Sequence, residues 1–387
     1  MPGDDFVVTP YEVRGKVDHE RLREKFGAEV LTPQLLQKLQ ALTGGELHPL
    51  LSRGVYYSHR DLATLLEKHR KGQPFVLYSG RGPSGPLHTA HLVPFELCQW
   101  LQAKLGVEMY IQITDDEKFW FRPHLTREET YRWGMENLID LIAVGFDPKK
   151  THVFFDTRSI GAMYSLAVDV AKRIPYSTVR AVFGFPPSQN IGLVFYTALQ
   201  TVPAFYPSWV AGRPVPCLIP CGIDQDPHFR VTRDIADGLG YPKPALVHSV
   251  MLPGLLGDRV MSTTGDSKDN ALFLNDPPKE VARKIRHAFT GGRASVEEQR
   301  RLGATPEICS VWAAWRSRFA ENETEFQQIT TDCRSGKLLC GDCKSNLIGR
   351  VQTFLADHAQ RRERAAEVAE SLIIERAPDG AGAAGRP

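Results

Sequence analysis

A chain of 387 residues has room for two or three domains, and its 42% hydrophobic content is enough for buried cores. The net charge of +2 gives no overall nucleic-acid signal, so any RNA contact must come from a local patch. No apolar run is long enough to span a membrane, and seven cysteines suit a reducing compartment better than a disulfide framework. We expect a cytoplasmic protein without membrane attachment. A mitochondrial location is the alternative, although no presequence is visible.

The pattern of strands and helices predicts four parts in chain order. Residues 1–70 are mixed and polar and form an N-terminal appended segment. Strands alternate with helices over residues 71–276, which predicts an α/β, Rossmann-like parallel sheet covered by helices. The strands disappear over residues 277–377, which read as an all-helical domain, and residues 378–387 read as a disordered low-complexity tail.

A glycine-rich turn leads into a helix and carries two histidines. The apolar run before Gly80 and Gly82 has strand character, and a helical pattern follows His88 and His91 until Gly106. Backbone N–H groups and two imidazoles would then converge at a helix N-terminus, which is how proteins hold phosphate. This geometry suggests a nucleotide triphosphate site.

Other interpretations of this segment compete with the nucleotide site. One alternative is that the two histidines, three residues apart, are zinc ligands, but no third ligand lies nearby in the sequence. Another alternative is that they are ordinary surface residues. Gly80, Gly82 and Gly85 match the dinucleotide-binding fingerprint, yet Pro83 and Pro86 interrupt it. No Gly-Lys-Ser/Thr follows, so the turn is not a P-loop.

Two more polar clusters follow predicted strands. Glu117 comes after the strand at residues 107–114, and Asp224 comes after the strand at residues 215–220. Ligands of parallel sheets bind beyond the carboxyl ends of strands, so these residues and His88 predict one site.

Taken together, these segments resemble the eukaryotic and archaeal type of tryptophanyl-tRNA synthetase, a class I aminoacyl-tRNA synthetase. The similarity covers nearly the whole chain. The segments that carry it are Tyr78–Pro83 with His88 and His91, Ile111–Lys118, Ile219–Pro227, Tyr241–Ser249 and Ala288–Arg293.

The resemblance implies a two-step tryptophan–tRNA ligase. Tryptophan attacks the α-phosphate of ATP, which is used with Mg²⁺, and the resulting adenylate is transferred to tRNA(Trp). A symmetric homodimer and an anticodon-binding role for the helical domain are implied as well. Matching positions would bind tryptophan through Tyr78, Gln112, Glu117, Gln200 and Gln225. They would bind ATP through Gly80, Arg81, Gly82, His88, His91, Asp224, Met261 and Ser262.

Two positions depart from the family pattern. Ala90 replaces the glycine before the second histidine, and Val260 replaces the lysine of the mobile phosphate loop. The expected catalytic residues are therefore His88 and His91 together with Arg259, Ser262 and Lys268. Arg259 or Lys268 would substitute for the missing charge. We predict that Arg259→Ala slows adenylate formation much more than it weakens tryptophan binding, which pyrophosphate exchange measures.

Four cysteines of the helical region have ligand-like spacing. Cys309, Cys333, Cys340 and Cys343 are separated by 23, 6 and 2 residues, similar to an iron–sulfur motif in certain tryptophanyl-tRNA synthetases. A [4Fe–4S] cluster, zinc and unliganded buried thiols are the alternatives.

Two alternative functions remain open. A degenerate paralogue that binds tryptophan or adenylate without charging tRNA is suggested by Ala90 and Val260. A dinucleotide-dependent oxidoreductase rests on the glycine pattern alone.

Overall fold

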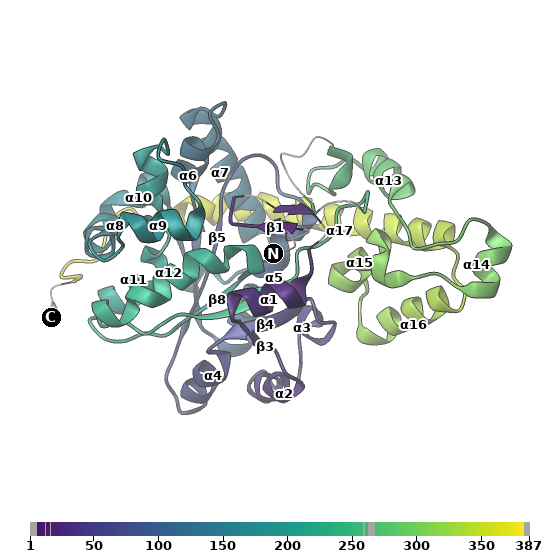
Figure 1. The fold of residues 1–387 in the computed structure, drawn as a ribbon, viewed down its shortest axis with the longest axis horizontal. Helices are drawn as coiled ribbons and strands as arrows, with labels where there is room; N and C mark the ends of the chain where they lie inside the picture. The colour runs from purple at the N-terminus through teal and green to yellow at the C-terminus, as the bar shows by residue number, and fades with distance from the viewer. Residues whose placement is uncertain (1–5, 12, 16, 258–259, 262–267, 383–387) are drawn as a thin grey trace.

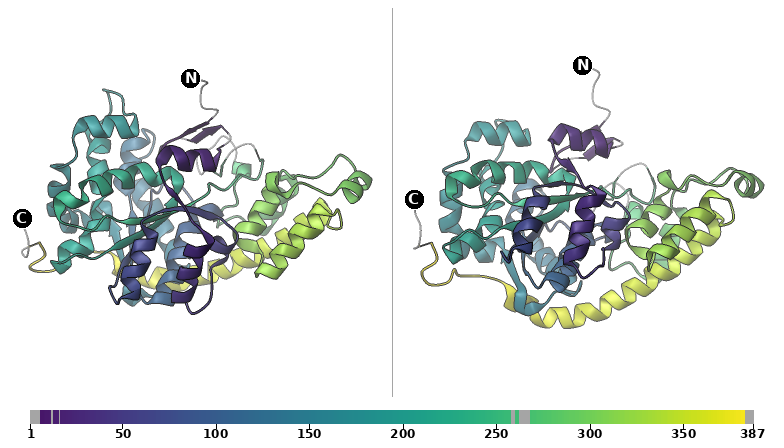
Figure 2. Two further views of the ribbon diagram at one scale, coloured as in Figure 1. Left: turned by 60° about the horizontal axis from the view of Figure 1, so that its bottom comes forward. Right: turned by 90° about the horizontal axis from the view of Figure 1, so that it is seen from below.

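The computed structural model describes residues 6–11, 13–15, 17–257, 260–261 and 268–382. A seven-stranded sheet with helices on both faces forms the larger part, and an elongated group of helices extends from it (Figures 1 and 2). The strands are β1 (Phe6–Val8), β2 (Val13–Gly15), β3 (Glu29–Val30), β4 (Tyr56–Arg60), β5 (Val76–Arg81), β6 (Glu108–Ile113), β7 (Thr151–Phe155), β8 (Cys217–Gly222) and β9 (Ala245–Ser249).

The large sheet has the order β3-β4-β9-β8-β5-β6-β7, and β1 pairs only with β2. Strands β5 to β9 are parallel, whereas β4 runs antiparallel to β9 and β3 antiparallel to β4. The chain passes from β5 to β6 on one side and reaches β8 on the other side. The sheet therefore has a topological switch point at β5, where open α/β sheets bind ligands.

Alternate side chains of β5 point to two different cores. Leu77 belongs to the core on one face and Tyr78 to the core on the other, because successive strand residues face opposite ways. The first face packs against α4 (Leu62–Arg70), α5 (Val93–Leu105) and α7 (Arg127–Ile142). The second face packs against α8 (Asp156–Ala171), α10 (Ile191–Leu199), α11 (Val202–Ala211) and α12 (Asp226–Ala236).

Shorter helices complete the part that contains the sheet. They are α1 (His19–Phe26), α2 (Pro33–Leu42), α3 (Pro49–Ser52), α6 (Asp115–Phe121) and α9 (Tyr176–Phe183). The helical region contains α13 (Pro278–His287), α14 (Val296–Leu302), α15 (Ser310–Ala314), the π-helical turn η7 (Trp315–Phe319), α16 (Glu323–Arg334) and α17 (Cys340–Ala369).

Local sequence signals set several of these boundaries. The capping box of Thr126 and Glu129 opens α7, and Gly106 ends α5 in the left-handed conformation with a φ of 67°. The predicted α/β fold with a parallel, Rossmann-like sheet and a helical C-terminal region is confirmed by the sheet order and the helices after β9.

Helix α17 returns from the helical region to the sheet (Figure 2). Arg361 donates to the Ala143 carbonyl at 2.9 Å and Arg362 pairs with Glu136 at 2.6 Å. These arginines therefore dock α17 on α7. The chain then continues along the sheet edge, where the Ile374 N–H donates to the Val153 carbonyl at 2.8 Å.

The boundaries predicted at residues 70, 276 and 377 stay predictions. Residues 378–382 form a turn in which Gly382 lies against the Trp209 ring, and the rest of the predicted tail lies outside the described residues. Within the described ranges, none of the helices combines the length and apolar character that crossing a membrane requires.

Candidate active site

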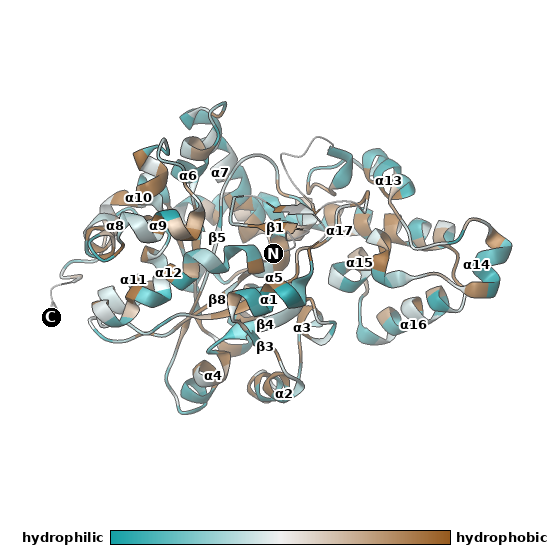
Figure 3. Cartoon of the chain, in the orientation of Figure 1, coloured by the Kyte–Doolittle hydropathy of each residue, from teal (hydrophilic) through white to brown (hydrophobic). Residues whose placement is uncertain are grey.

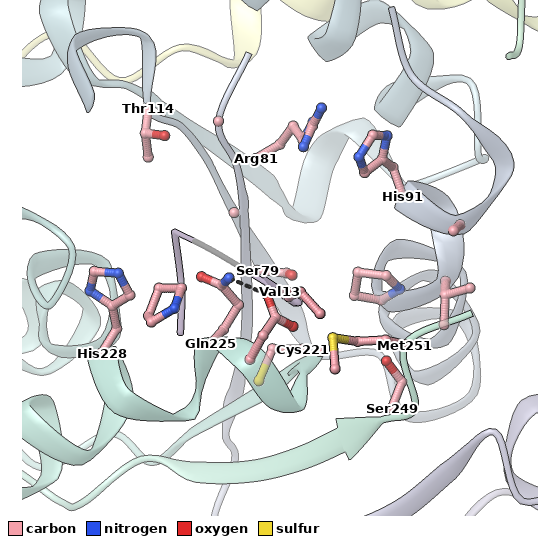
Figure 4. Close-up of a pocket in the computed structure, with 18 of the residues that line it drawn as sticks. Val13, Ser79, Arg81, His91, Thr114, Cys221, Gln225, His228, Ser249 and Met251 are labelled. Atoms are coloured by element: carbon pink, nitrogen blue, oxygen red, sulfur yellow. Dashed lines mark hydrogen bonds between the residues drawn. The ribbon is translucent and has the colours of Figure 1, made fainter. Parts of the chain in front are cut away.

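A cavity of about 520 Å³ opens at the carboxyl ends of β5, β6 and β8, at the switch point of the sheet (Figure 4). Most of the site residues predicted from the sequence line it. These are Gly80, Arg81, Gly82, His88, His91, Glu117, Gln200, Asp224, Gln225 and Met261.

The two histidines occupy the turn between β5 and α5. Their rings stack with centroids 3.5 Å apart, and the His88 backbone N–H donates to His91 Nδ1 at 3.1 Å. Burial, assisted by nearby Arg81, lowers the pKa of His88 to about 3. His88 is therefore neutral at pH 7. Its ring lines the cavity, and neither buried ring nitrogen has a hydrogen-bond partner among the described residues.

Two cationic side chains face the same cavity. Burial lowers the pKa of Arg81 to about 10, which still leaves the guanidinium charged at neutral pH. Lys118 Nζ lies 2.8 Å from Glu117 Oε1, and both side chains lie over Gly82. A Cβ at Gly82 would meet Lys118 Cε and Glu117 Oε2, so a larger residue there would displace the ends of these two side chains.

The carboxylate of Glu117 and the amide of Gln200 lie deeper in the site. Glu117 accepts from Thr114 Oγ1 at 3.2 Å, and the Tyr196 hydroxyl donates to Gln200 Oε1. A carboxylate and an amide oxygen in one cavity can bind an ammonium group.

Tyr78 and Gln112 do not line the cavity. Both are completely buried behind its wall, and the Tyr78 hydroxyl donates to Gln112 Oε1 at 2.5 Å. Gln200 Nε2 in turn donates to the Tyr78 hydroxyl oxygen at 3.0 Å. The pair therefore connects to the cavity through Gln200.

The end of β8 brings Gln225 across the cavity from Arg81 and His91 (Figure 4). Gln225 donates to Asp224 at 2.6 Å. The following residue, Asp226, accepts from Arg60 at 2.7 Å. Burial opposes ionisation of Asp226, but hydrogen bonds from His248 and Arg60 overcome it and lower the pKa to about 2. This buried ion pair fixes the loop that carries Gln225.

The N-terminal hairpin β1–β2 supplies part of the wall, which the sequence did not indicate. Thr9, Tyr11 and Val13 line the cavity. The Tyr11 ring packs 5.0 Å from Phe121 and 5.9 Å from His228, measured between centroids.

The predicted phosphate loop is only partly described. Met261 lines the cavity, where Thr89 Oγ1 approaches its sulfur at 3.9 Å. Arg259 and Ser262 lie outside the described residues. Lys268 is exposed at the start of η5 (Lys268–Asn270) and is not part of the lining.

Comparison with known proteins shows to which family this chain belongs. The family model described as "tRNA synthetases class I (W and Y)" matches residues 70–356. The chain belongs to the class I tRNA synthetases. Similar curated proteins are the tryptophan--tRNA ligases of Pyrobaculum calidifontis, 46% identical over 96% of this chain and 98% of the relative, and of Saccharolobus solfataricus, 44% identical over 95% of each. A similar solved structure is the tryptophanyl-tRNA synthetase from Giardia lamblia, with a TM-score of 0.86 and 35% identity over 92% of this chain and 96% of that chain.

These findings confirm the resemblance inferred from the sequence motifs, including its archaeal type. The synthetase also contains site residues that sequence reasoning missed. They are Lys118, at the end of the segment Ile111–Lys118, and His228, four residues after Asp224. The position of His228 shortly after the strand that precedes Asp224 was the available signal. The hairpin residues that line the cavity had no such signal in the sequence.

The four cysteines of the helical region lie near one another in the synthetase. Cys309 precedes α15, Cys333 lies near the end of α16, and Cys340 and Cys343 begin α17. Burial raises the pKa of Cys343 to about 12, and the charges of the other three thiols also raise it. These four residues form one thiol cluster.

The thiol cluster does not have the geometry of a ligand set. No group of three or more His, Cys, Asp or Glu side chains is arranged to hold a metal ion in the part of the chain that the structure describes. Cys340 Sγ instead lies 3.4 Å from Gln299 Nε2. The predicted [4Fe–4S] cluster is therefore not supported by this arrangement, because its thiols would have to converge further.

Proposed function

We infer that the chain is a tryptophan–tRNA ligase that activates tryptophan with ATP and then charges tRNA(Trp). One observation carries this inference: a single cavity joins the His88–His91 turn to Glu117 and Gln225 in a chain of the class I tRNA synthetases. The names of the similar curated proteins support tryptophan as the amino acid.

We propose that the triphosphate lies between the histidine turn and the two cations. Neutral His88 and His91 donate hydrogen bonds, while Arg81 and Lys118 supply positive charge to the phosphates. Lys118 then provides charge that Val260 in the phosphate loop does not. The Mg²⁺ that accompanies ATP is part of the substrate. The enzyme's contribution is to position the tryptophan carboxylate and to stabilise charge on the phosphates.

The amino-acid end lies toward Glu117. Glu117 and Gln200 bind the ammonium group, and Gln225 accepts the indole N–H. Tyr78 and Gln112 act from behind the wall by holding Gln200 in place. A site that pairs the indole N–H disfavours amino acids lacking it, since its own polar group would be left without a partner.

Pyrophosphate exchange with each amino acid tests the activation step, and charging of total tRNA tests the second step. We expect exchange with tryptophan and little with tyrosine, followed by charging. Exchange without charging would favour the degenerate paralogue. The absence of tryptophan-dependent exchange would contradict the inferred function.

We propose that tRNA contacts the helical region and that two copies assemble through α8 and α10. Exposed Arg300 and Arg301 on α14 supply a local basic surface for the tRNA.

Apolar side chains on α8 and α10 support the subunit interface. Tyr164 on α8 is 56% exposed and Ile191 on α10 is 81% exposed, and both helices show hydrophobic colour in Figure 3. Such apolar exposure is typical of a subunit interface. Sedimentation of Tyr164→Lys beside the parent protein tests the homodimer. A cytoplasmic location stays a prediction.

We also propose that the thiol cluster binds a metal group, with [4Fe–4S] and zinc as the alternatives. The sequence spacing of the four cysteines and the mutual electrostatic effect of their thiols support it, although the four sulfurs are not arranged as a ligand set. Metal binding would deprotonate these thiols and draw them together. Iron, sulfide and zinc analysis of anaerobically purified parent protein and Cys340→Ser tests the proposal. A parent protein with none of the three would contradict it.

A further inference from the structure

The π-helical turn η7 of the helical region contacts the back of the histidine turn. Two arginines of η7 point to different parts of the large sheet region. Arg318 reaches Thr89 and Glu96, whereas Arg316 reaches the backbone of Arg53 and Gly54. Single turns of this kind are rare and frequently lie at functional sites.

Arg318 is held tightly where it meets the histidine turn. Its side chain is 8% exposed, and it forms an ion pair with Glu96 of α5. Its Nη2 donates to the Thr89 carbonyl at 2.9 Å. The Phe354 ring of α17 covers the guanidinium at 5.0 Å from its centroid. Arg318 therefore links three elements, η7, α5 and α17, to the carbonyl of Thr89.

Thr89 lies between His88 and His91, and both of its backbone polar groups are used. Its N–H donates to the Leu272 carbonyl at 2.9 Å, and its carbonyl accepts from Arg318. The peptide planes on both sides of Thr89 are thus fixed. No hydrogen bond among the described residues holds the His88 ring itself. The anchored backbone and the stacking on His91 therefore decide together where the His88 imidazole points.

We propose that Arg318 is a positioning residue for ATP binding and activation. It does not line the cavity. It holds the Thr89 carbonyl so that the two imidazoles project toward the phosphates. This proposal rests on the inferred function, because it assigns those imidazoles to ATP. It also makes the nucleotide site depend on the docking of the helical region, since Arg318 lies 229 residues from Thr89 in the chain.

Arg316→Gln provides a matched control for Arg318→Gln. Arg316 also docks η7 on the sheet region, with hydrogen bonds of 2.7 and 2.6 Å, but it does not touch the histidine turn. A purely structural role would affect both variants alike. A positioning role predicts a loss that is confined to ATP-dependent steps and to the Arg318 variant.

The experiment measures pyrophosphate exchange with ATP and tryptophan varied separately, together with tryptophan binding without ATP and urea unfolding. For Arg318→Gln we expect roughly a tenfold or greater fall in kcat/KM for ATP, the size of losing a charged hydrogen bond, with tryptophan binding within about threefold. Arg316→Gln should keep kcat/KM for ATP within about twofold. Arg318→Lys should restore part of the ATP effect, because it keeps the charge beside Glu96.

Equal effects of the two glutamine variants on ATP, or equal losses for ATP and tryptophan, would overturn the proposal. If Arg318→Gln fails to fold, Arg318→Lys decides, because unchanged ATP kinetics in that variant would overturn the proposal and a selective ATP loss would support it. The parent enzyme separates the two hypotheses. A parent without tryptophan-dependent exchange defeats the inferred function, whereas a normal parent with an unaffected Arg318→Gln defeats only the positioning role.

Discussion

At the scale of single residues, the site combines buried neutral donors with two charged cations. Burial keeps His88 neutral, so it can orient phosphate but adds no charge. In the proposed ATP site the positive charge comes from Arg81 and Lys118, which line the same cavity as Glu117. Because the side chains of Lys118 and Glu117 are largely buried, their charges interact with a ligand more strongly than they would at an open surface.

This division of roles gives a prediction for Lys118. Lys118→Met keeps the length of the side chain and removes the charge that would face the phosphates. We expect kcat/KM for ATP to fall by about tenfold to a hundredfold, on the scale of a charged hydrogen bond. KM for tryptophan should not rise, since Glu117 loses a competitor of the ammonium group. Pyrophosphate exchange with each substrate varied in turn measures both quantities.

Lys268→Met is the matched control for this prediction. Lys268 is the residue that the sequence indicated as a substitute for the loop lysine, but it is exposed and does not line the cavity. We expect it to leave exchange nearly unchanged. A larger loss in Lys268→Met than in Lys118→Met would reverse the assignment and favour the sequence-based hypothesis.

At the scale of elements, local sequence signals predicted the turns and helix ends, because short-range backbone conformation determines these features. Gly80 and Gly82 after an apolar run indicated the turn before His88, and Gly106 indicated the end of the helical pattern that forms α5. Contacts between distant segments have no such signal. The packing of Tyr11 against the cavity depends on the tertiary fold, and nothing in the local pattern predicted it. The burial of Tyr78 behind the wall has the same origin.

The connection between α14 and α16 gives a prediction at this scale. Gly303 ends α14 with a φ of 67°, and a Cβ there would collide with the Arg334 carbonyl. The next residue, Ala304, donates its N–H to the Cys333 carbonyl at 3.0 Å. We expect Gly303→Ala to lower the free energy of unfolding by about 3 kcal/mol, from backbone strain and overpacking together. Urea unfolding measures this change.

Gly349→Ala provides the control. Gly349 lies within α17 and is exposed, and a methyl group added there would meet no atom within 4 Å among the described residues. Alanine there should stabilise the protein by about 0.5–1 kcal/mol through helix propensity. A Gly303→Ala variant as stable as the parent would show that the connection can move away from Arg334.

At the scale of the whole molecule, burial of ionisable groups links stability to pH in both directions. Burial lowers the pKa of His19 and of His48 to about 4, and of His88 and His228 to about 3. The unfolded chain therefore binds protons below pH 6.5 that the folded chain does not, and these histidines destabilise the fold in acid. Burial raises the pKa of Glu96 to about 7, which acts in the opposite direction.

A single histidine away from the cavity isolates one of these contributions. His48 caps α3, where its Nδ1 accepts from the Leu50 N–H at 3.1 Å. Burial, followed by the charges of Arg318 and Arg53, lowers its pKa to about 4. Asparagine is also a good N-cap residue but does not titrate. His48→Asn should therefore have nearly the parent's stability at pH 7 and lose less of it on acidification.

The size and sign of this effect follow from the two pKa values. Between pH 6.5 and about 4 the parent loses stability as the pH falls, because only its unfolded state protonates His48. At pH 5 the difference between variant and parent should reach about 1–2 kcal/mol in favour of the variant. Urea unfolding of both proteins at pH 7 and pH 5 measures this difference. The contributions of Glu96 and the other histidines cancel, because both proteins contain them. Equal losses of stability in the two proteins would mean that His48 protonates as readily in the folded enzyme as in the unfolded chain.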